Sequence, residues 1–378
     1  MKVLTVIGTR PEAIKMAPVI KGLEKYPDKI RSVVCATAQH RDMLDQVLKI
    51  FDIRPDYDLN VMLPDQTLSQ LTANILIRLD QVMAKERPDW VLVQGDTTTV
   101  MVAGLVAYYH RARVGHVEAG LRTDDKWQPY PEEINRRLTD VLADLYFAPT
   151  EINKQNLLRE GVPEQAIVVT GNTVIDALLM TVERLRQEGD CSDRWSSNGR
   201  PLILITAHRR ENFGQPLIRI CRALAEIATR YPSDVQLVYP VHPNPNVLGP
   251  VHEMLGNIPN ITLTEPLDYY DFVRLMSQSY LILTDSGGLQ EEAPSLGVPV
   301  LVLREVTERP EGVAAGVVKL VGTDNRMITR EVVTLLEDEK VYQHMARGVN
   351  PYGDGRASQR IVEAIRSVSG SISRDGLP

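Results

Sequence analysis

The stretch LILTDSGGLQEEA, residues 281–293, places an apolar run directly before Ser286-Gly287-Gly288 and a helical pattern directly after it. A buried strand that turns sharply into a helix is the simplest structure for this order. Glycine lets the backbone approach a ligand, and the free N–H groups of a helix start attract phosphate. Glu292, one turn into the helix, is placed to accept hydrogen bonds from ribose hydroxyls. The stretch predicts a phosphate site, with a plain tight turn as the alternative.

Apolar runs and helical patterns alternate outward from this stretch along the chain. Strands are expected at 3–7, 30–36, 90–94, 114–117, 145–148, 166–169, 201–206, 235–240, 261–263, 281–284 and 298–303, with helices between them such as 68–85, 100–109, 217–230 and 269–278. This alternation implies parallel sheets covered on both faces. We therefore predict an α/β fold of two Rossmann-like domains, 1–186 and 200–356, facing across a cleft and joined by a polar linker at 187–200. Ligands bind beyond the carboxyl ends of such strands.

The first strand ends in Gly8-Thr9-Arg10-Pro11-Glu12, and a helical pattern follows through about Lys25. The G-x-G-x-x-G spacing of a dinucleotide site is absent, which argues against a nicotinamide-dependent oxidoreductase. Arg10 instead offers a planar fork for phosphate, and Lys15 a second cation one turn later. A solvated surface pair is the alternative.

Three carboxylates follow successive elements of the first half. Asp96 and Glu118 each follow a strand, and Glu132 lies at the start of a helix. A single carboxylate in such a place is usually a helix cap, but three at one sheet edge are expected to converge. Crowded carboxylates have separated protonation states, so one donates a proton while another accepts it.

Histidines add to this candidate set. His208 follows a strand of the second half and is expected to face the first-domain carboxylates, with Arg209 and Arg210 beside it. His242 is a weaker candidate, and His116, within a strand, is expected to be buried and hydrogen-bonded.

Composition excludes several classes of function. The net charge is −7, which argues against duplex nucleic acid as a partner. Three separated cysteines and scattered histidines indicate a reduced compartment without a disulfide framework or metal site. We find no apolar run long enough to span a membrane and no signal-peptide pattern, so a cytoplasmic location is expected.

Taken together, the motifs resemble those of the non-hydrolysing UDP-N-acetylglucosamine 2-epimerases. The resemblance rests on GTRPEAIKMAP, QHRDMLDQVL, QGDTTT, GHVEAGLRT, PYPEEINRR, TAHRRENFG, TDSGGLQEEAPSLGVPVLVLR, TERPEG and NPYGDGRAS, in this order. It implies a glycosyltransferase-B-type architecture, with a last helix at about 357–378 packing back on the first domain. It also implies a homodimer and the reversible conversion of UDP-N-acetylglucosamine to UDP-N-acetylmannosamine for cell-surface polysaccharide. The route would be anti elimination of UDP to 2-acetamidoglucal and syn re-addition, without a cofactor.

Residue by residue, the resemblance implies three groups of sites. The catalytic group is Asp96, Glu118, Glu132 and His208. The group that holds the UDP-sugar is Arg10, Lys15, Leu267, Phe272, Ser286, Gly287, Gly288, Glu292 and Arg309. A second, activating UDP-N-acetylglucosamine would contact Gln39, Glu132, Arg210 and His242, although Asp42 and Asp65 depart from the family pattern. A hydrolysing epimerase and a UDP-sugar glycosyltransferase remain alternatives.

Overall fold

The computed structural model describes residues 1–37, 41–63, 65–189 and 199–369. The chain divides into two compact units. Unit 1 comprises Met1–Ala177 and Gly353–Pro378, and unit 2 comprises Leu178–Tyr352. The division falls within one helix, residues 173–187, whereas the sequence placed the boundary after residue 186. Most of the expected linker, and Cys191, lie outside the described residues.

The described residues of unit 1 form a seven-stranded parallel sheet in the order β3-β2-β1-β4-β5-β6-β7. The strands are β1 (Lys2–Ile7), β2 (Arg31–Ala36), β3 (Tyr57–Asp58), β4 (Trp90–Gln94), β5 (Arg113–Val117), β6 (Leu145–Ala148) and β7 (Ile167–Val169). Strands β2 and β3 are added on one side of β1, and strands β4 to β7 are added on its other side. The order of the strands therefore reverses at β1. Parallel sheets of this kind place their ligands at such a point.

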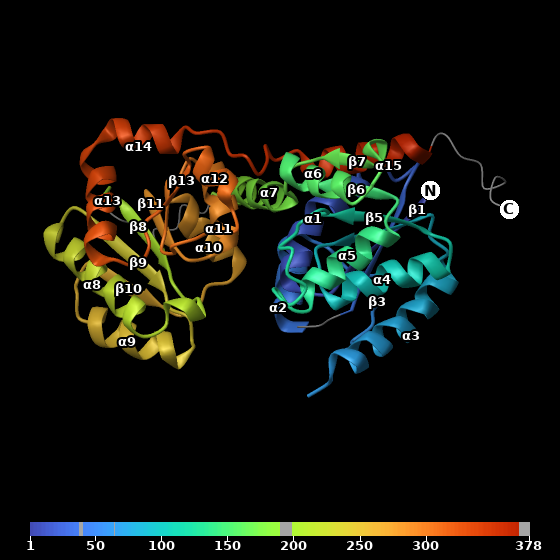
Figure 1. The fold of residues 1–378 in the computed structure, drawn as a ribbon, viewed down its shortest axis with the longest axis horizontal. Helices are drawn as coiled ribbons and strands as arrows, with labels where there is room; N and C mark the ends of the chain where they lie inside the picture. The colour runs from blue at the N-terminus through green and yellow to red at the C-terminus, as the bar shows by residue number, and fades with distance from the viewer. Residues whose placement is uncertain (38–40, 64, 190–198, 370–378) are drawn as a thin grey trace. The chain divides into compact units, whose positions relative to one another are not determined.

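Helices cover both faces of this sheet (Figure 1). They are α1 (Arg10–Glu24), α2 (Arg41–Ile50), α3 (Leu68–Glu86), α4 (Thr98–Tyr109), α5 (Glu132–Leu142), α6 (Glu151–Arg159) and α15 (Ala357–Ser369). Helix α7 (Thr173–Gln187) begins in unit 1 and ends in unit 2, where Leu178 and Val182 belong to a buried core. One face of the strands, with Leu4, Val6 and Val91, packs on α3 and α4 in one buried cluster. The opposite face of β1, β2 and β4 packs on α1.

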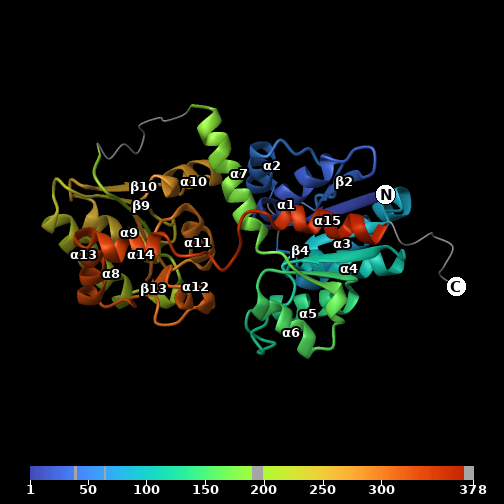
Figure 2. The ribbon, with the colours of Figure 1, turned by 90° about the horizontal axis from the view of Figure 1, so that it is seen from above.

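The last helix returns to unit 1. Helix α15 packs beside α1, as Figure 2 shows. The Asp176 carboxylate of α7 accepts the backbone N–H groups of Ala357 and Ser358 at 3.1 and 2.8 Å and the Ser358 hydroxyl at 2.6 Å. A carboxylate on the unpaired N–H groups of a helix start is a stabilising cap.

The described residues of unit 2 form a six-stranded parallel sheet in the order β10-β9-β8-β11-β12-β13. The strands are β8 (Leu202–Thr206), β9 (Gln236–Pro240), β10 (Ile261–Thr264), β11 (Leu281–Thr284), β12 (Val300–Val302) and β13 (Val318–Leu320). The helices are α8 (Gln215–Arg230), α9 (Pro245–Leu255), α10 (Tyr269–Ser277), α11 (Gly287–Glu292), α12 (Pro310–Ala314), α13 (Asn325–Glu337) and α14 (Glu339–Ala346).

Successive residues of the unit 2 strands enter two separate cores. Ile203, Leu283 and Leu301 pack with α8, α9 and α13 on one face. Leu204 and Ile282 pack with α10 and α11 on the other. Strands buried on both faces are continuous apolar runs, which is why the sequence reveals them. The predicted α/β class with two parallel sheets is confirmed.

Two strands are absent from the sequence prediction. The pair Tyr57–Asp58 is too short to give a pattern, and Val318–Leu320 contains an exposed lysine in its middle. Both lie at a sheet edge. Within the described part of the chain, no helix is long and apolar enough to cross a membrane.

Candidate active site

Glu118 accepts hydrogen bonds from three other side chains. The Lys15 ammonium lies 2.6 and 2.8 Å from its two carboxylate oxygens. Asn172 donates to the same carboxylate at 3.0 Å, and Gln94 donates a further short hydrogen bond. Lys15, predicted as a phosphate ligand, is therefore bound to a candidate catalytic group in this structure.

The backbone at Glu118 is in the left-handed region, with φ of +67°. A residue with a β-carbon adopts this conformation only where its surroundings enforce it, and such residues cluster at functional sites. Glu118 is buried, and its four polar contacts supply that constraint. We infer a carboxylate fixed in position before substrate arrives.

Asp96 follows strand β4, and Glu118 follows the neighbouring strand β5. The register pairs Gln94 with Val117, so the two carboxylates leave the sheet at the same edge. Arg136 lies 2.8 Å from the Asp96 carboxylate. Burial raises the pKa of Asp96, the Arg136 charge lowers it, and the Glu118 charge raises it again. An aspartate with a raised pKa suits proton transfer better than an ordinary one.

Glu132 begins α5 and is partly exposed. Its charge also raises the pKa of Asp96, so these two carboxylates are close enough to interact. The structure thus brings Asp96, Glu118 and Glu132 into one electrostatic cluster. Glu133, the next residue, is different, because it is buried and bound to Arg137 at 2.8 Å.

The turn after β1 is closed by a residue that the sequence analysis overlooked. The Glu12 carboxylate accepts the Gly8 N–H at 2.6 Å and the Thr9 hydroxyl at 3.0 Å. Burial raises the pKa of Glu12 to about 7. Arg10, the first residue of α1, is exposed beside this turn. A side chain at Gly8 would collide with Thr99, because its β-carbon would lie 2.5 Å from that hydroxyl.

In unit 2, Asp285 organises the loop that carries His208. One oxygen of this fully buried carboxylate accepts the backbone N–H groups of His208 and Arg209, both at 2.8 Å, and the Asn212 amide at 3.0 Å. The other oxygen lies 3.6 Å from the His208 Nδ1 atom. The sequence placed Asp285 only as part of a strand end, so its role was missed.

The His208 ring lies over the His242 ring, with centroids 5.4 Å apart and planes 13° from parallel. Burial lowers the pKa of His208, and the charge of Asp285 opposes this shift. Arg210, predicted for the activator site with His242, is exposed.

The Ser286-Gly287-Gly288 turn leads from β11 into α11, as predicted. Ser286 takes the N-cap position, and α11 ends at Glu292. Arg309 is bound to Glu291 through its guanidinium. The β-carbon that Gly288 lacks would lie 3.3 Å from the Glu292 carboxylate, so Glu292 closes over the glycines.

The remaining predicted residues fall into two groups. Leu267 and Phe272 are partly buried and pack against the unit 2 core that contains α10 and α11. Gln39 and the side chain of Asp42 lie outside the described residues. Asp65 is exposed, with φ of +54°.

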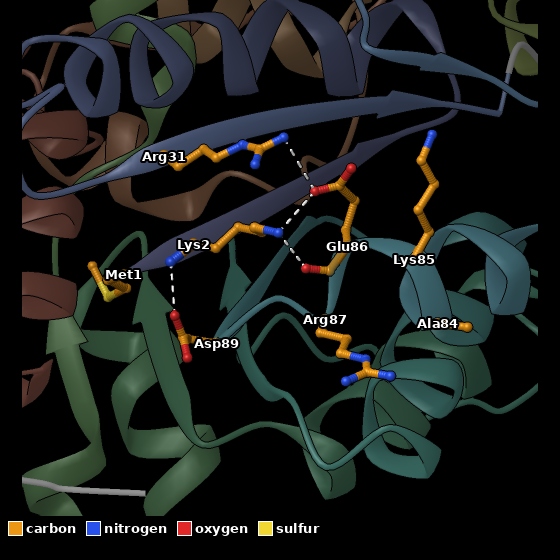
Figure 3. Close-up of a pocket in the computed structure, with 8 residues that line it drawn as sticks. All are labelled: Met1, Lys2, Arg31, Ala84, Lys85, Glu86, Arg87 and Asp89. Atoms are coloured by element: carbon orange, nitrogen blue, oxygen red, sulfur yellow. Dashed lines mark hydrogen bonds and ion pairs between the residues drawn. The ribbon is translucent and has the colours of Figure 1, made fainter.

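A surface pocket of 640 Å³ lies at the opposite, amino ends of β1, β2 and β4 (Figure 3). Lys2 lies 3.0 Å from the Glu86 carboxylate, Arg31 lies 3.5 Å from it, and the Lys2 backbone N–H donates to Asp89 at 2.7 Å. These charged groups bind one another and fasten the end of α3 to β1. The pocket is therefore separate from the carboxylate cluster, which lies at the carboxyl ends.

Two parallel sheets with acid–base side chains beyond the carboxyl ends of the strands define an α/β enzyme of the Rossmann-like class. Residues 22–366 match the family model described as UDP-N-acetylglucosamine 2-epimerase. The chain belongs to this family. It is 56% identical to the UDP-N-acetylglucosamine 2-epimerase of Salmonella typhimurium over 98% of this chain and all of that protein.

Solved structures agree. The crystal structure of a Listeria monocytogenes protein described as a UDP-N-acetylglucosamine 2-epimerase has a TM-score of 0.93 at 49% identity. The match covers 99% of this chain and 98% of that one. The Neisseria meningitidis enzyme bound to UDP-GlcNAc has a TM-score of 0.86 at 52% identity, covering 97% of this chain and 100% of that one.

Proposed function

We propose that this protein interconverts UDP-N-acetylglucosamine and UDP-N-acetylmannosamine by proton exchange at C2 of the sugar. The observation that carries the proposal is the carboxylate cluster of unit 1, with Asp96 and Glu118 leaving adjacent strands at one edge. Inversion at C2 removes a proton and returns one to the opposite face, which requires groups that accept and donate it. Asp96, with its raised pKa, is our candidate for the base that removes the C2 proton.

In this proposal, loss of the C2 proton breaks the bond between C1 and UDP and gives 2-acetamidoglucal. UDP then adds back to C1 as a proton enters C2 from the opposite face. The departing UDP carries charge that must be stabilised. Arg10 and the Ser286-Gly287-Gly288 turn are our candidates for its phosphates, and Glu292 for its ribose. His208, whose backbone N–H is held by Asp285, is our candidate donor of a hydrogen bond to the departing group. Leu267 and Phe272 supply the apolar side of the uracil site.

The direct test is proton NMR of UDP-N-acetylglucosamine incubated with the protein in deuterated water, without added NAD or metal. We expect UDP-N-acetylmannosamine to form and deuterium to enter C2 of both sugars. Free N-acetylmannosamine with UDP would instead indicate a hydrolysing epimerase. An unchanged spectrum would contradict the proposal and favour a transferase that lacks its acceptor.

Two isosteric substitutions test the carboxylates. Asp96→Asn and Glu118→Gln keep the shape of each side chain but remove its ability to exchange a proton. We expect each to abolish turnover while circular dichroism and thermal unfolding show an intact fold. Near-normal kcat in both variants would remove these residues from the acid–base set.

Activation by a second substrate molecule is a further part of the proposal. His242 and Arg210 follow strands of unit 2 near His208, and Glu132 lies in unit 1. Asp65 occupies a position where related sequences can carry arginine, and the loss of that cation would weaken contacts to the phosphates of the second molecule. A lag with pure UDP-N-acetylmannosamine that vanishes on adding UDP-N-acetylglucosamine would support activation, and a hyperbolic curve without a lag would contradict it.

We also propose a homodimer formed through the outer faces of α4 and α5. These helices lie side by side (Figure 2). The β-carbon that Gly104 lacks would lie 3.5 Å from the Leu142 side chain. Tyr108 is exposed at the end of α4, and Ile134, Leu138 and Val141 are exposed on α5. The spacing of the last three residues puts them on one helical face. Two adjacent helices with an uncovered apolar stripe suit a self-complementary interface.

A cytoplasmic location completes the proposal. Cys35 and Cys221 are free thiols buried in separate cores. Unpaired cysteines are the rule in reducing compartments. Fractionation of cells, followed by detection of the protein in the soluble cytoplasmic fraction, would check it.

A further inference from the structure

His116 is a fully buried residue of β5, one position before the strand ends. Both of its ring nitrogens are engaged. Nδ1 lies 2.6 Å from the Asp140 carboxylate, and Nε2 lies 2.7 Å from the backbone carbonyl oxygen of Gly95. Its burial and hydrogen bonding confirm the sequence prediction, but its two partners imply more than a satisfied core histidine.

The two acceptors determine where the protons are. A carbonyl oxygen only accepts, so Nε2 of His116 must carry a proton. An ionised carboxylate also only accepts, so Nδ1 must carry one as well. Arg122 donates to the other Asp140 oxygen at 2.7 Å, which favours the ionised carboxylate. His116 is then an imidazolium with no exposed surface.

The surrounding charges support this assignment. Asp140 and its hydrogen bond raise the pKa of His116 against the effect of burial, and the nearby Asp96 charge adds to the rise. The charges of His116 and Arg122 lower the pKa of Asp140. Arg122 is balanced in turn by Glu160 at 2.5 Å. The chain Glu160–Arg122–Asp140–His116 thus alternates in sign, as a buried charge requires.

The Gly95 carbonyl belongs to the turn that carries Asp96. The Gly95 N–H donates to the Val117 carbonyl at 3.0 Å, next to Glu118. Helix α5 reaches the same turn directly, because Asn135 donates to the Asp96 carbonyl oxygen at 3.0 Å and Arg136 binds the Asp96 carboxylate. His116 therefore adds a third attachment, through Asp140, between α5 and this turn.

We propose that His116 is a positioning residue, a buried imidazolium whose charge-assisted hydrogen bond to Gly95 fixes Asp96 relative to Glu118. The inference rests on the proposed epimerase function, since it assigns a purpose to the geometry of those two carboxylates. His116 itself touches no substrate. A charge-assisted hydrogen bond is roughly twice as strong as a neutral one, so the charge of His116 matters as well as its shape.

Asp140→Asn tests the charge. Whichever way the new amide is oriented, His116 keeps one ring proton, and its bond to Gly95 becomes an ordinary one or is lost. We expect kcat to fall about tenfold or more, with KM little changed, because a displacement of the reacting groups affects turnover more than binding. The matched control is Asp144→Asn, whose carboxylate accepts the Val114 N–H at 2.7 Å at the opposite end of β5. We expect its kcat to stay at the wild-type value.

The protonation state has its own readout, independent of activity. In protein labelled with ¹⁵N-histidine and held above the ordinary histidine pKa of about 6.5, His116 should retain both ring protons. We expect this signal to disappear in His116→Gln and to become that of a neutral imidazole in Asp140→Asn. A neutral His116 in the wild-type protein would overturn the inference, as would equal kcat in Asp140→Asn and Asp144→Asn. Wild-type protein that fails to epimerise would contradict the proposed function alone, since the NMR signal still reports on His116.

Discussion

At the scale of single residues, Arg136 opposes the rise in the pKa of Asp96, the proposed base, that burial causes. Its guanidinium favours the ionised form of Asp96, whose pKa is raised by burial. Arg136→Gln removes that cation, so the pKa of Asp96 should rise further. A base must be deprotonated to act, and we expect the acidic limb of the kcat/KM profile to move to higher pH. Arg137→Gln is the matched control, because Arg137 pairs with Glu133 instead. Superimposable profiles for the two variants would contradict the assignment.

Asp285 is the corresponding residue of unit 2. Asp285→Asn keeps the size of the side chain but removes a buried charge that accepts three N–H groups. We expect a loss of about 1–3 kcal/mol in the free energy of unfolding, measured with denaturant. The pKa of His208 should also fall, since the Asp285 charge raises it. The control is Asp324→Asn, because Asp324 is an exposed helix cap. If His208 gives the same NMR titration in Asp285→Asn as in Asp324→Asn, this role of Asp285 is contradicted.

At the scale of elements, the outer face of α5 carries the proposed dimer interface. Leu138→Glu introduces a charge in the middle of its exposed apolar stripe. We expect light scattering to show a monomer, because an unpaired carboxylate at the core of an interface is costly to desolvate. Val349→Glu is the control, since Val349 is also an exposed apolar residue but lies in unit 2. A wild-type protein that is already monomeric would contradict the interface.

The elements also show how far sequence patterns reach. The strands Trp90–Gln94, Leu145–Ala148 and Leu281–Thr284 have the bounds that their apolar runs predict. Burial on both faces makes such a strand visible as an uninterrupted run. The edge strand Tyr57–Asp58 was not predicted. It has only two residues and pairs with a single neighbouring strand, so its sequence shows no apolar run.

At the scale of the whole molecule, the chain ends by returning to the unit in which it began. Asp176→Ala would leave the first N–H groups of α15 without their carboxylate. We expect faster hydrogen exchange of the α15 amides and a loss of about 1–3 kcal/mol in the stability of unit 1. Asp354→Ala, which removes an exposed ion pair with Arg360, should cost only about 0–1 kcal/mol. Equal effects of the two substitutions would contradict a capping role for Asp176.

The sequence by itself determined the α/β class, the order of most strands and helices, the family, and which carboxylates are candidates for acid–base catalysis. These properties depend on local periodicity and on short motifs at strand ends, which are written in consecutive residues. Only the tertiary structure decided that Lys15 binds Glu118 and that Asp285 accepts the backbone N–H of His208. It also decided that the two ring nitrogens of His116 bond to Asp140 and Gly95. Those partners lie from 21 to 103 residues apart. Their meeting depends on the register and packing of separate elements, which no local pattern encodes.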